Sequence, residues 1–260
     1  VQSPFQRVRI LESTKYGKML ALDDMVMTTI KDEFHYHEMI SHPSLFTLQN
    51  AKNVLVIGGG DGGTVREVLR HANIEKVTMV EIDGEVIKAC KEHLPEIAAS
   101  FNDPRLELIV DDGIAFVKNA PDAIYDLLIV DGSDPVGPAE GLFSVDFYQN
   151  CYRTLKADGI LVAQGESPKF NEKAFAELNH TLQDIFGKEN APVSLFYVPT
   201  YPTGMWSFQY GIKGGIAPKA ITNEAAIDAF VDAKGLRYYN SDIHKASFAT
   251  PNFVKTLIKK

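Results

Sequence analysis

Residues 53–63 read NVLVIGGGDGG, and this stretch constrains the fold more than any other part of the chain. The four apolar residues 54–57, with Val and Ile among them, are typical of a parallel strand that is covered on both faces. A helical pattern over residues 63–71 follows the glycines. Three of these glycines fit the spacing G-x-G-x-x-G: Gly58, Gly60 and Gly63. A strand, a tight glycine turn and a helix N-terminus together predict a nucleotide-binding corner.

Asp61 is the unusual residue of this loop. A pyrophosphate group binds to backbone N–H groups and to the positive end of a helix dipole. A carboxylate within the loop would repel phosphate, whereas it would attract a cation. Asp61 therefore favours a cationic ligand over one that carries phosphate groups.

Strands and helices alternate regularly after residue 53, which predicts a doubly wound α/β sheet. The expected strands of this sheet are 53–57, 77–82, 106–110, 126–130, 160–164, 193–198 and 206–213. A short loop separates the last two strands, so we expect them to pair antiparallel. We divide the chain into residues 1–50, with N-terminal strands and a linking helix, and a catalytic domain over residues 51–260.

The ends of the chain predict less regular structure. Residues 1–30 indicate a small antiparallel β-element with two turns. Asp32 is expected to cap a helix from residue 33 to about 41, and Pro43 to begin a separate helical turn. After residue 218 we expect one helix, over 223–233, and irregular segments.

Composition excludes several classes of protein. The net charge of −8 argues against a nucleic-acid binder. The sequence has no apolar run of transmembrane length and no signal-peptide pattern at its start, so we expect no membrane partner. Cys90 and Cys151 lie in helical apolar patterns, which predicts buried thiols in a reducing compartment, the cytoplasm.

Three histidines invite a metal interpretation: His35, His37 and His42. On a helix, residues two positions apart point about 200° away from each other, so His35 and His37 cannot bind one ion. We therefore expect partly exposed or hydrogen-bonded histidines and no metal.

Acidic residues lie at the carboxyl ends of four successive strands: Asp61, Glu81, Asp112, and Asp131 with Asp134. In open α/β sheets this edge binds the ligand. Glu81 lies about 20 residues beyond the glycine loop, where an acid accepts bonds from ribose hydroxyls. Asp112 and Gly113 are placed to meet adenine. Asp131 and Asp134 suit ammonium groups, so the pattern favours an adenosyl sulfonium with a free amine, plus a polyamine.

The chain resembles the spermidine synthases, a family of polyamine aminopropyltransferases, and especially their bacterial members. The matching segments are SPFQRVRI, GKMLALDDMVMTT, DEFHYHEMISH, VLVIGGGDGGTVREVLRH, VEID, DDG, DGSDPVGPAEGLF, PTYPTGMWSF and DIHKASF. The resemblance implies a Rossmann-like fold of the S-adenosylmethionine-dependent methyltransferase type. It implies transfer of the aminopropyl group of decarboxylated S-adenosylmethionine to putrescine, giving spermidine and 5′-methylthioadenosine. It implies no further cofactor and a homodimer or homotetramer.

The resemblance also implies a role for individual residues. By similarity, Asp131 is the base and Tyr36 shares a hydrogen bond at the attacking nitrogen. The donor would contact Gln6, Asp61, Glu81, Asp112, Gly113 and Pro138. The polyamine would contact His37, Asp61, Asp131, Asp134, Gln164 and Tyr201. Residues 134–143 resemble the family's gatekeeping loop. Animal members carry glutamine at the position of His37.

Alternatives remain open at this point. Cadaverine, agmatine or spermidine could replace putrescine as the acceptor. A methyltransferase that uses intact S-adenosylmethionine has the same fold, although Asp61 should repel the carboxylate of that donor. An NAD-dependent oxidoreductase and a non-catalytic polyamine-binding protein are the more distant alternatives.

Overall fold

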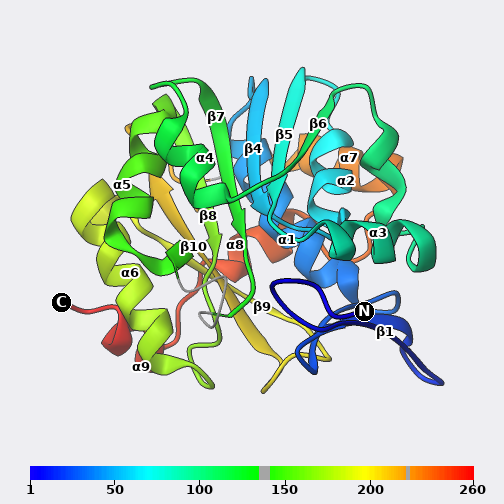
Figure 1. Ribbon diagram of the computed structural model, residues 1–260. Helices are drawn as coiled ribbons and strands as arrows, with labels where there is room; N and C mark the ends of the chain where they lie inside the picture. The colour runs from blue at the N-terminus through cyan, green and yellow to red at the C-terminus, as the bar shows by residue number, and fades with distance from the viewer. Residues whose placement is uncertain (135–140, 221–222) are drawn as a thin grey trace.

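The computed structural model describes residues 1–134, 141–220 and 223–260. Its central sheet has the strand order β6-β5-β4-β7-β8-β10-β9 (Figure 1). The strands are β4 (Asn53–Gly58), β5 (Lys76–Glu81), β6 (Leu106–Val110), β7 (Tyr125–Asp131), β8 (Leu155–Gln164), β9 (Val193–Tyr197) and β10 (Met205–Ile212). The strands from β6 to β8 pair in parallel, and β10 runs antiparallel to both β8 and β9, as expected from its short connection.

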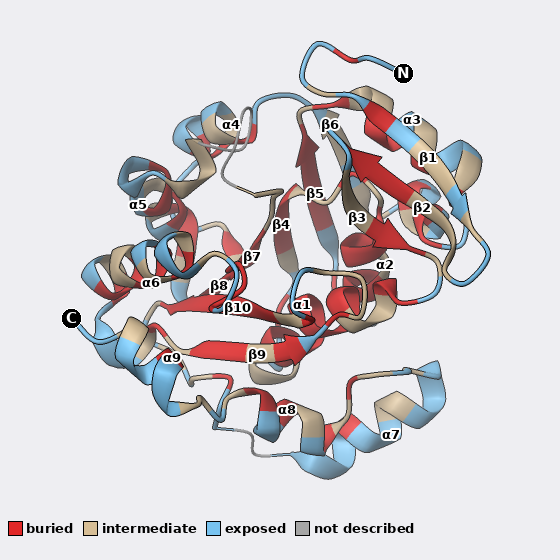
Figure 2. Cartoon of the chain, turned by 90° about the horizontal axis from the view of Figure 1, so that it is seen from below, coloured by how far each residue is buried: buried red, intermediate tan, exposed pale blue. Residues whose placement is uncertain are grey.

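Helices cover both faces of this sheet because its strands are apolar on both sides. Val54 and Val56 of β4 point into one core cluster, and Leu55 and Ile57 point into the other. The first face carries α1 (Glu33–Thr47), α2 (Gly63–Leu69), α3 (Gly84–His93), α7 (Glu224–Lys234) and α8 (Ser241–Ser247). The second carries α4 (Gly113–Asn119), α5 (Val145–Thr154) and α6 (Glu172–Phe186). Figure 2 shows the buried strands between these two layers.

The N-terminal residues form a separate three-stranded antiparallel sheet, as the sequence predicts. It consists of β1 (Val8–Ser13), β2 (Gly17–Leu22) and β3 (Met25–Thr29), and β1 lies against α3. Figure 1 shows this sheet in dark blue, below the carboxyl ends of the parallel strands. The fold is thus the predicted Rossmann-like α/β architecture with a small N-terminal β-element.

The predicted break in the first helix is wrong, because α1 runs without interruption through Pro43. A proline inside a helix removes a hydrogen bond and costs about 3 kcal/mol. Ile40 and Leu45, on either side of Pro43, are both buried in the main core. Burial of each such side chain contributes roughly 1.5–3 kcal/mol, so tertiary packing outweighs the local cost.

The predicted capping role of Asp32 is also wrong. Asp32 occupies the N-cap position of α1, but its side chain caps no helix N–H. One carboxylate oxygen accepts a hydrogen bond from the Thr29 hydroxyl at 2.5 Å. The other accepts from the backbone N–H and the hydroxyl of Thr200, at 3.0 and 2.7 Å. Asp32 therefore binds Thr200, which is distant in sequence, instead of an N–H group of its own helix.

The C-terminal region contains more helix than expected. Where the sequence predicts one helix, the structure has three, α7, α8 and α9 (Asn252–Leu257). The last two have only 7 and 6 residues, too short for a clear periodic pattern. Within the described residues, no helix combines the length and the apolar character that a membrane span requires.

Glu38 ties α1 to this C-terminal region. Its buried carboxylate accepts hydrogen bonds from three successive backbone N–H groups, those of Arg237, Tyr238 and Tyr239, at 2.9, 2.9 and 2.8 Å. A segment about 200 residues away in sequence thereby positions the helix that carries Tyr36 and His37.

We expect Glu38→Ala to lower the free energy of unfolding by roughly 3–5 kcal/mol, because it leaves three backbone donors without a partner. Urea denaturation at one fixed protein concentration measures this loss. Glu12→Ala, at an exposed position of β1, serves as the control and should change stability by less than about 0.5 kcal/mol. Equal stabilities of the two variants would contradict the role given to Glu38.

Candidate active site

A cavity of about 470 Å³ opens at the carboxyl ends of the parallel strands, where the neighbouring strands β4 and β7 end. This is the size of a small-molecule site, and it lies at the topological switch point of the sheet. Every predicted site residue that the structure describes lines the cavity: Gln6, Tyr36, His37, Asp61, Glu81, Asp112, Gly113, Asp131, Asp134, Gln164 and Tyr201. Pro138 and most of the predicted gatekeeping loop lie outside the described residues.

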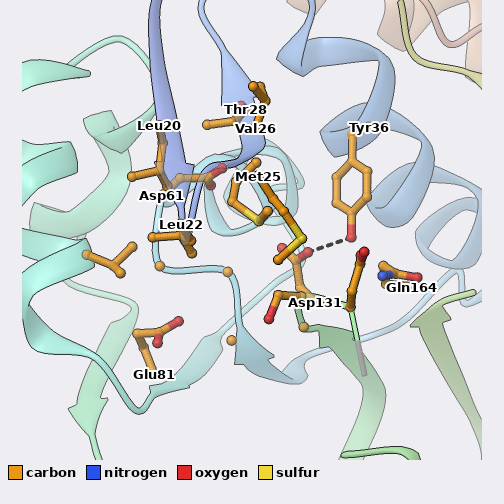
Figure 3. A pocket seen from close by; sticks show the side chains of 18 of the residues that line it. Leu20, Leu22, Met25, Val26, Thr28, Tyr36, Asp61, Glu81, Asp131 and Gln164 are labelled. Atoms are coloured by element: carbon orange, nitrogen blue, oxygen red, sulfur yellow. Dashed lines mark hydrogen bonds between the residues drawn. The ribbon is translucent and has the colours of Figure 1, made fainter. Parts of the chain in front are cut away.

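The cavity has an apolar wall that the sequence analysis did not predict. Side chains of the N-terminal sheet form this wall: Leu20, Leu22, Met25, Val26, Met27 and Thr28. In Figure 3 those that are labelled lie on the N-terminal strands, above Asp131 and Glu81. The alternation of residues in a short antiparallel element gave no indication that its inner face meets a ligand cavity rather than a core.

Backbone geometry brings the glycine loop against Asp131. Gly58 at the end of β4 pairs with Asp131 at the end of β7, and the Gly59 N–H donates to the Asp131 carbonyl at 3.0 Å. Gly58 has a φ of +81°, and a Cβ there would lie 2.3 Å from that carbonyl oxygen. Only glycine fits this position, because the two backbones touch.

Both carboxylate oxygens of the half-buried Asp131 accept hydrogen bonds from hydroxyl groups. Tyr36 donates to Oδ1 at 2.7 Å (dashed line in Figure 3), and Thr64 donates to Oδ2 at 2.6 Å. Burial and the carboxylate of Asp61 raise the pKa of Asp131, and the charge of His37 and the two hydroxyls oppose this rise. The result is a fixed carboxylate that is a stronger base than an exposed one.

Glu81 lies at the other end of the cavity from Gln164 (Figure 3). Burial, with the nearby carboxylates of Asp83 and Asp131, raises the pKa of Glu81 to about 7. The Gln6 amide donates to Asp83 at 3.0 Å, which holds Gln6 beside Glu81 in the wall of the cavity.

Asp112 caps α4 and accepts a hydrogen bond from the Ile114 backbone N–H at 2.8 Å. Gly113 begins that helix next to Ile57. The predicted adenine-binding pair thus lies at a helix start on the cavity rim, where Asp112 keeps acceptor capacity for a ligand.

Glu166 is an acidic residue that the sequence analysis missed. It follows β8, so a fifth strand end also carries a carboxylate. Glu166 is fully buried, and it accepts from the amide of Gln164 at 2.9 Å. Burial and the carboxylate of Asp134 raise the pKa of Glu166 to about 7, and burial also raises the pKa of Asp134. The sequence did contain a signal for Glu166, because this residue lies two positions beyond Gln164, directly after a buried strand.

Tyr201 closes the cavity from the loop between β9 and β10. Its hydroxyl donates to the backbone carbonyl of Met27 in β3, at 2.6 Å. The ring packs edge-on against Trp206, with centroids 4.8 Å apart. This contact joins the N-terminal sheet to the wall of the central domain.

The three histidines of α1 have different surroundings. His35 contacts the Tyr197 carbonyl at 2.8 Å, and the buried His42 lies between His71 and Glu67, at 3.0 and 3.1 Å. His37 is held between Glu33 and Asp61. Among residues 1–134, 141–220 and 223–260, no group of three or more His, Cys, Asp or Glu side chains is arranged to hold a metal ion.

Comparison with known proteins gives consistent results along the whole chain. A family model described as a spermine/spermidine synthase domain matches residues 33–216. A second one, described as a spermidine synthase tetramerisation domain, matches residues 1–29. The polyamine aminopropyltransferase of Clostridioides difficile (strain 630) is 47% identical over 262 residues, which cover 99% of this chain and 90% of that protein. The one from Moorella thermoacetica is 45% identical over 269 residues, with 99% and 88% covered.

Solved structures agree with these relatives. Spermidine synthase from Thermotoga maritima superimposes with a TM-score of 0.93 and 41% identity, over 99% of this chain and 86% of that one. A spermidine synthase in complex with the transition-state analogue AdoDATO gives a TM-score of 0.94 at the same identity and coverage.

We expect Thr64→Val to raise the pKa of Asp131 further, because the variant loses a hydrogen bond that stabilises the carboxylate. A ¹³C NMR titration of the Asp131 carboxyl group measures the change. Thr64→Ser keeps the hydroxyl and should keep the pKa. Thr78→Val on β5 makes the same replacement of a buried threonine by valine at another site, and it should leave the pKa of Asp131 unchanged. An unchanged pKa in Thr64→Val would contradict this assignment.

Proposed function

Because the chain belongs to the spermine/spermidine synthase family, we propose that it transfers the aminopropyl group of decarboxylated S-adenosylmethionine to putrescine. The products would be spermidine and 5′-methylthioadenosine. The protein is a transferase of the polyamine aminopropyltransferase type. The observation that carries the finer proposal is the position of Asp131, a half-buried carboxylate that Tyr36 and Thr64 hold in the wall of an acidic cavity.

The proposed reaction is a direct displacement. The acceptor nitrogen forms a bond to the methylene carbon next to the sulfonium, and the carbon–sulfur bond breaks with its electron pair moving to sulfur. Sulfur leaves as a neutral thioether, and the proton of the attacking nitrogen moves to Asp131. A primary amine with a pKa near 10 is less than about 1% neutral at pH 7, a cost of roughly 4 kcal/mol. A carboxylate within hydrogen-bond reach offsets much of this cost as the bond forms.

The donor fits the end of the cavity where Glu81 lies. Glu81 would accept the ribose hydroxyls, Asp112 and Gly113 would face the adenine, and Gln6 would close over the nucleoside. Asp61 would bind the ammonium group of the aminopropyl arm. This last contact favours the decarboxylated donor, since intact S-adenosylmethionine would bring a carboxylate to an acidic loop.

The acceptor fits the opposite end. Asp131 would face the reacting nitrogen, while Asp134 and Glu166 would attract an ammonium group at the other end of the molecule. Gln164 and Tyr201 line the same cavity and would form the walls of a channel for the acceptor. Two separated acidic points support an acceptor with two amines rather than one.

The family match over residues 1–29 supports a homo-oligomer, and we propose a homotetramer built through this N-terminal element. The free, buried Cys90 and Cys151 suit a reducing compartment, and we propose that the protein works in the cytoplasm.

The first experiment follows the release of methylthioadenosine from decarboxylated S-adenosylmethionine with putrescine, cadaverine, agmatine or spermidine. We expect the highest kcat/KM with putrescine. Asp131→Asn should lower kcat at least roughly 100-fold, because the base is lost. The matched control is Asp146→Asn, on the exposed surface of α5, which should keep normal turnover.

Intact S-adenosylmethionine is tested in parallel. If methylthioadenosine is released fastest with an amine other than putrescine, the proposed mechanism stands and that amine is the acceptor. No release with any amine, together with methyl transfer from intact S-adenosylmethionine, would reject the proposal. Near-normal turnover of Asp131→Asn would reject the assignment of the base.

Glu166→Gln should raise the KM for putrescine roughly 10- to 100-fold, because the distal ammonium loses a charged partner. The wild-type KM should also rise as the pH falls through about 7, where Glu166 gains a proton. The variant should lack this pH dependence. Butylamine, which has no distal amine, is the matched control substrate, and its KM should not respond to the substitution. Equal effects on both amines would contradict the role of Glu166.

A further inference from the structure

Asp83 is a buried acidic residue behind the donor end of the cavity, and it takes no part in the proposed reaction. It lies two residues beyond Glu81, where β5 ends and α3 begins. Only 1% of its surface is exposed, and it is not among the described residues that line the cavity. A buried carboxylate is costly unless hydrogen bonds satisfy its oxygens, so its partners indicate what it does.

The hydrogen bonds of Asp83 connect three parts of the structure. Its backbone N–H donates to Glu81 Oε1 at 2.9 Å. Its side-chain Oδ1 accepts from the backbone N–H of Glu85 at 3.1 Å and so caps α3. Its Oδ2 accepts from the Ser3 hydroxyl at 2.7 Å and from the Gln6 amide at 3.0 Å. Asp83 therefore joins the acid of the donor end, the helix behind it and the N-terminal segment.

Residues 3–6 form a compact bend, which we call the N-terminal bend. The Ser3 hydroxyl accepts from the backbone N–H groups of Phe5 and Gln6, each at 3.1 Å. The Ser3 N–H donates to the Gln6 carbonyl at 3.0 Å. Ser3 is buried, whereas 39% of Phe5 is exposed. The bend is thus anchored to α3 through its first and last residues, both of which bind Asp83.

The contact with Asp83 also orients the amide of Gln6. A carboxylate can only accept hydrogen bonds, so the amide nitrogen of Gln6 faces Asp83 and the amide oxygen points away from it. Gln6 and Glu81 both line the cavity. The two groups that would contact the nucleoside are therefore held by one residue, Gln6 by its side chain and Glu81 by its backbone N–H.

Helix capping alone does not account for these contacts. Oδ1 of Asp83 is sufficient for the cap, and serine caps a helix about as well as aspartate. Serine has one side-chain oxygen, however, and the cap uses it. Asp83→Ser therefore keeps the cap of α3 and the backbone N–H at Glu81, while it removes the acceptor for Ser3 and Gln6.

We propose that Asp83 is a positioning residue for the donor: its side chain holds the N-terminal bend against the start of α3, so that Gln6 faces the nucleoside beside Glu81. Asp83 itself does not touch the ligand. The inference rests on the proposed function, since it concerns the donor of that reaction. The bend belongs to the segment that matches the tetramerisation domain, so Asp83 also ties that segment to the donor end of the cavity.

The first measurement is backbone hydrogen exchange in the free protein, and it needs no substrate. The N–H groups of Phe5 and Gln6 should exchange at least roughly tenfold faster in Asp83→Ser than in the wild type, because the bend loses its anchor. The N–H groups of Glu85 and Val86, in the first turn of α3, should keep their rates. Equal exchange of the bend in both proteins would overturn the proposal, whatever reaction the protein catalyses.

The second measurement is ligand affinity. Asp83→Ser should raise the Kd of methylthioadenosine, measured by calorimetry, and the KM of decarboxylated S-adenosylmethionine by roughly 10-fold each. The kcat and the KM for putrescine should stay within about twofold. Methylthioadenosine has no sulfonium charge, so a loss confined to the charged donor would show only the missing negative charge and would overturn the proposal. Asp228→Ser is the matched control, because Asp228 on α7 also accepts from a serine hydroxyl, that of Ser241 at 2.9 Å.

The third measurement asks whether Asp83 acts through Gln6. In a Gln6→Ala background, Asp83→Ser should weaken methylthioadenosine binding by less than about twofold more, since the group that it positions is already absent. A full tenfold further loss would overturn the proposal, because Asp83 would then act independently of Gln6. A wild type that neither binds nor releases methylthioadenosine would reject the proposed function, and the exchange rates would still test the role of Asp83 in holding the bend.

Discussion

Gly58 and Asp131 pair across β4 and β7, and the two backbones touch where the strands end. This contact determines the distance between the glycine loop and Asp131, because β4 and β7 are paired residue by residue from Val54 with Leu127 to Gly58 with Asp131. Asp61, Thr64 and the start of α2 follow from the same loop. The position of every group around Asp131 thus depends on the register of two buried parallel strands.

The parts of the site predicted from sequence are those that local patterns determine. An apolar run, a glycine turn and a helical period place Gly58, Asp61 and Thr64 in order along the chain. Acids that end successive parallel strands must lie on one edge, so Glu81, Asp112 and Asp131 were expected to come together without any knowledge of their contacts. The resemblance to a known family then added Tyr36, Gln164 and Tyr201, whose sequence positions alone indicate no function.

The remaining parts depend on contacts between distant segments. Asp32 lost its predicted capping role to Thr200, and Pro43 stayed inside α1 because its buried neighbours outweigh the local cost. The pairing of Glu33 with His37 at helical spacing was visible in the sequence, but the third partner, Arg66, belongs to another helix. Whether a charged residue faces solvent or a buried partner is decided by packing, which no single segment encodes.

The two walls of the cavity are chemically unlike. Carboxylates gather at the strand ends, and leucine, methionine and valine side chains of the N-terminal sheet lie opposite them. A flexible molecule with cationic ends and a methylene chain can satisfy both walls in one way only: lengthwise, with its charges toward the sheet edge and its carbon atoms against the apolar side. If the proposed displacement takes place in this cavity, the difference in solvation between its walls would extend and orient the substrates before any single hydrogen bond forms.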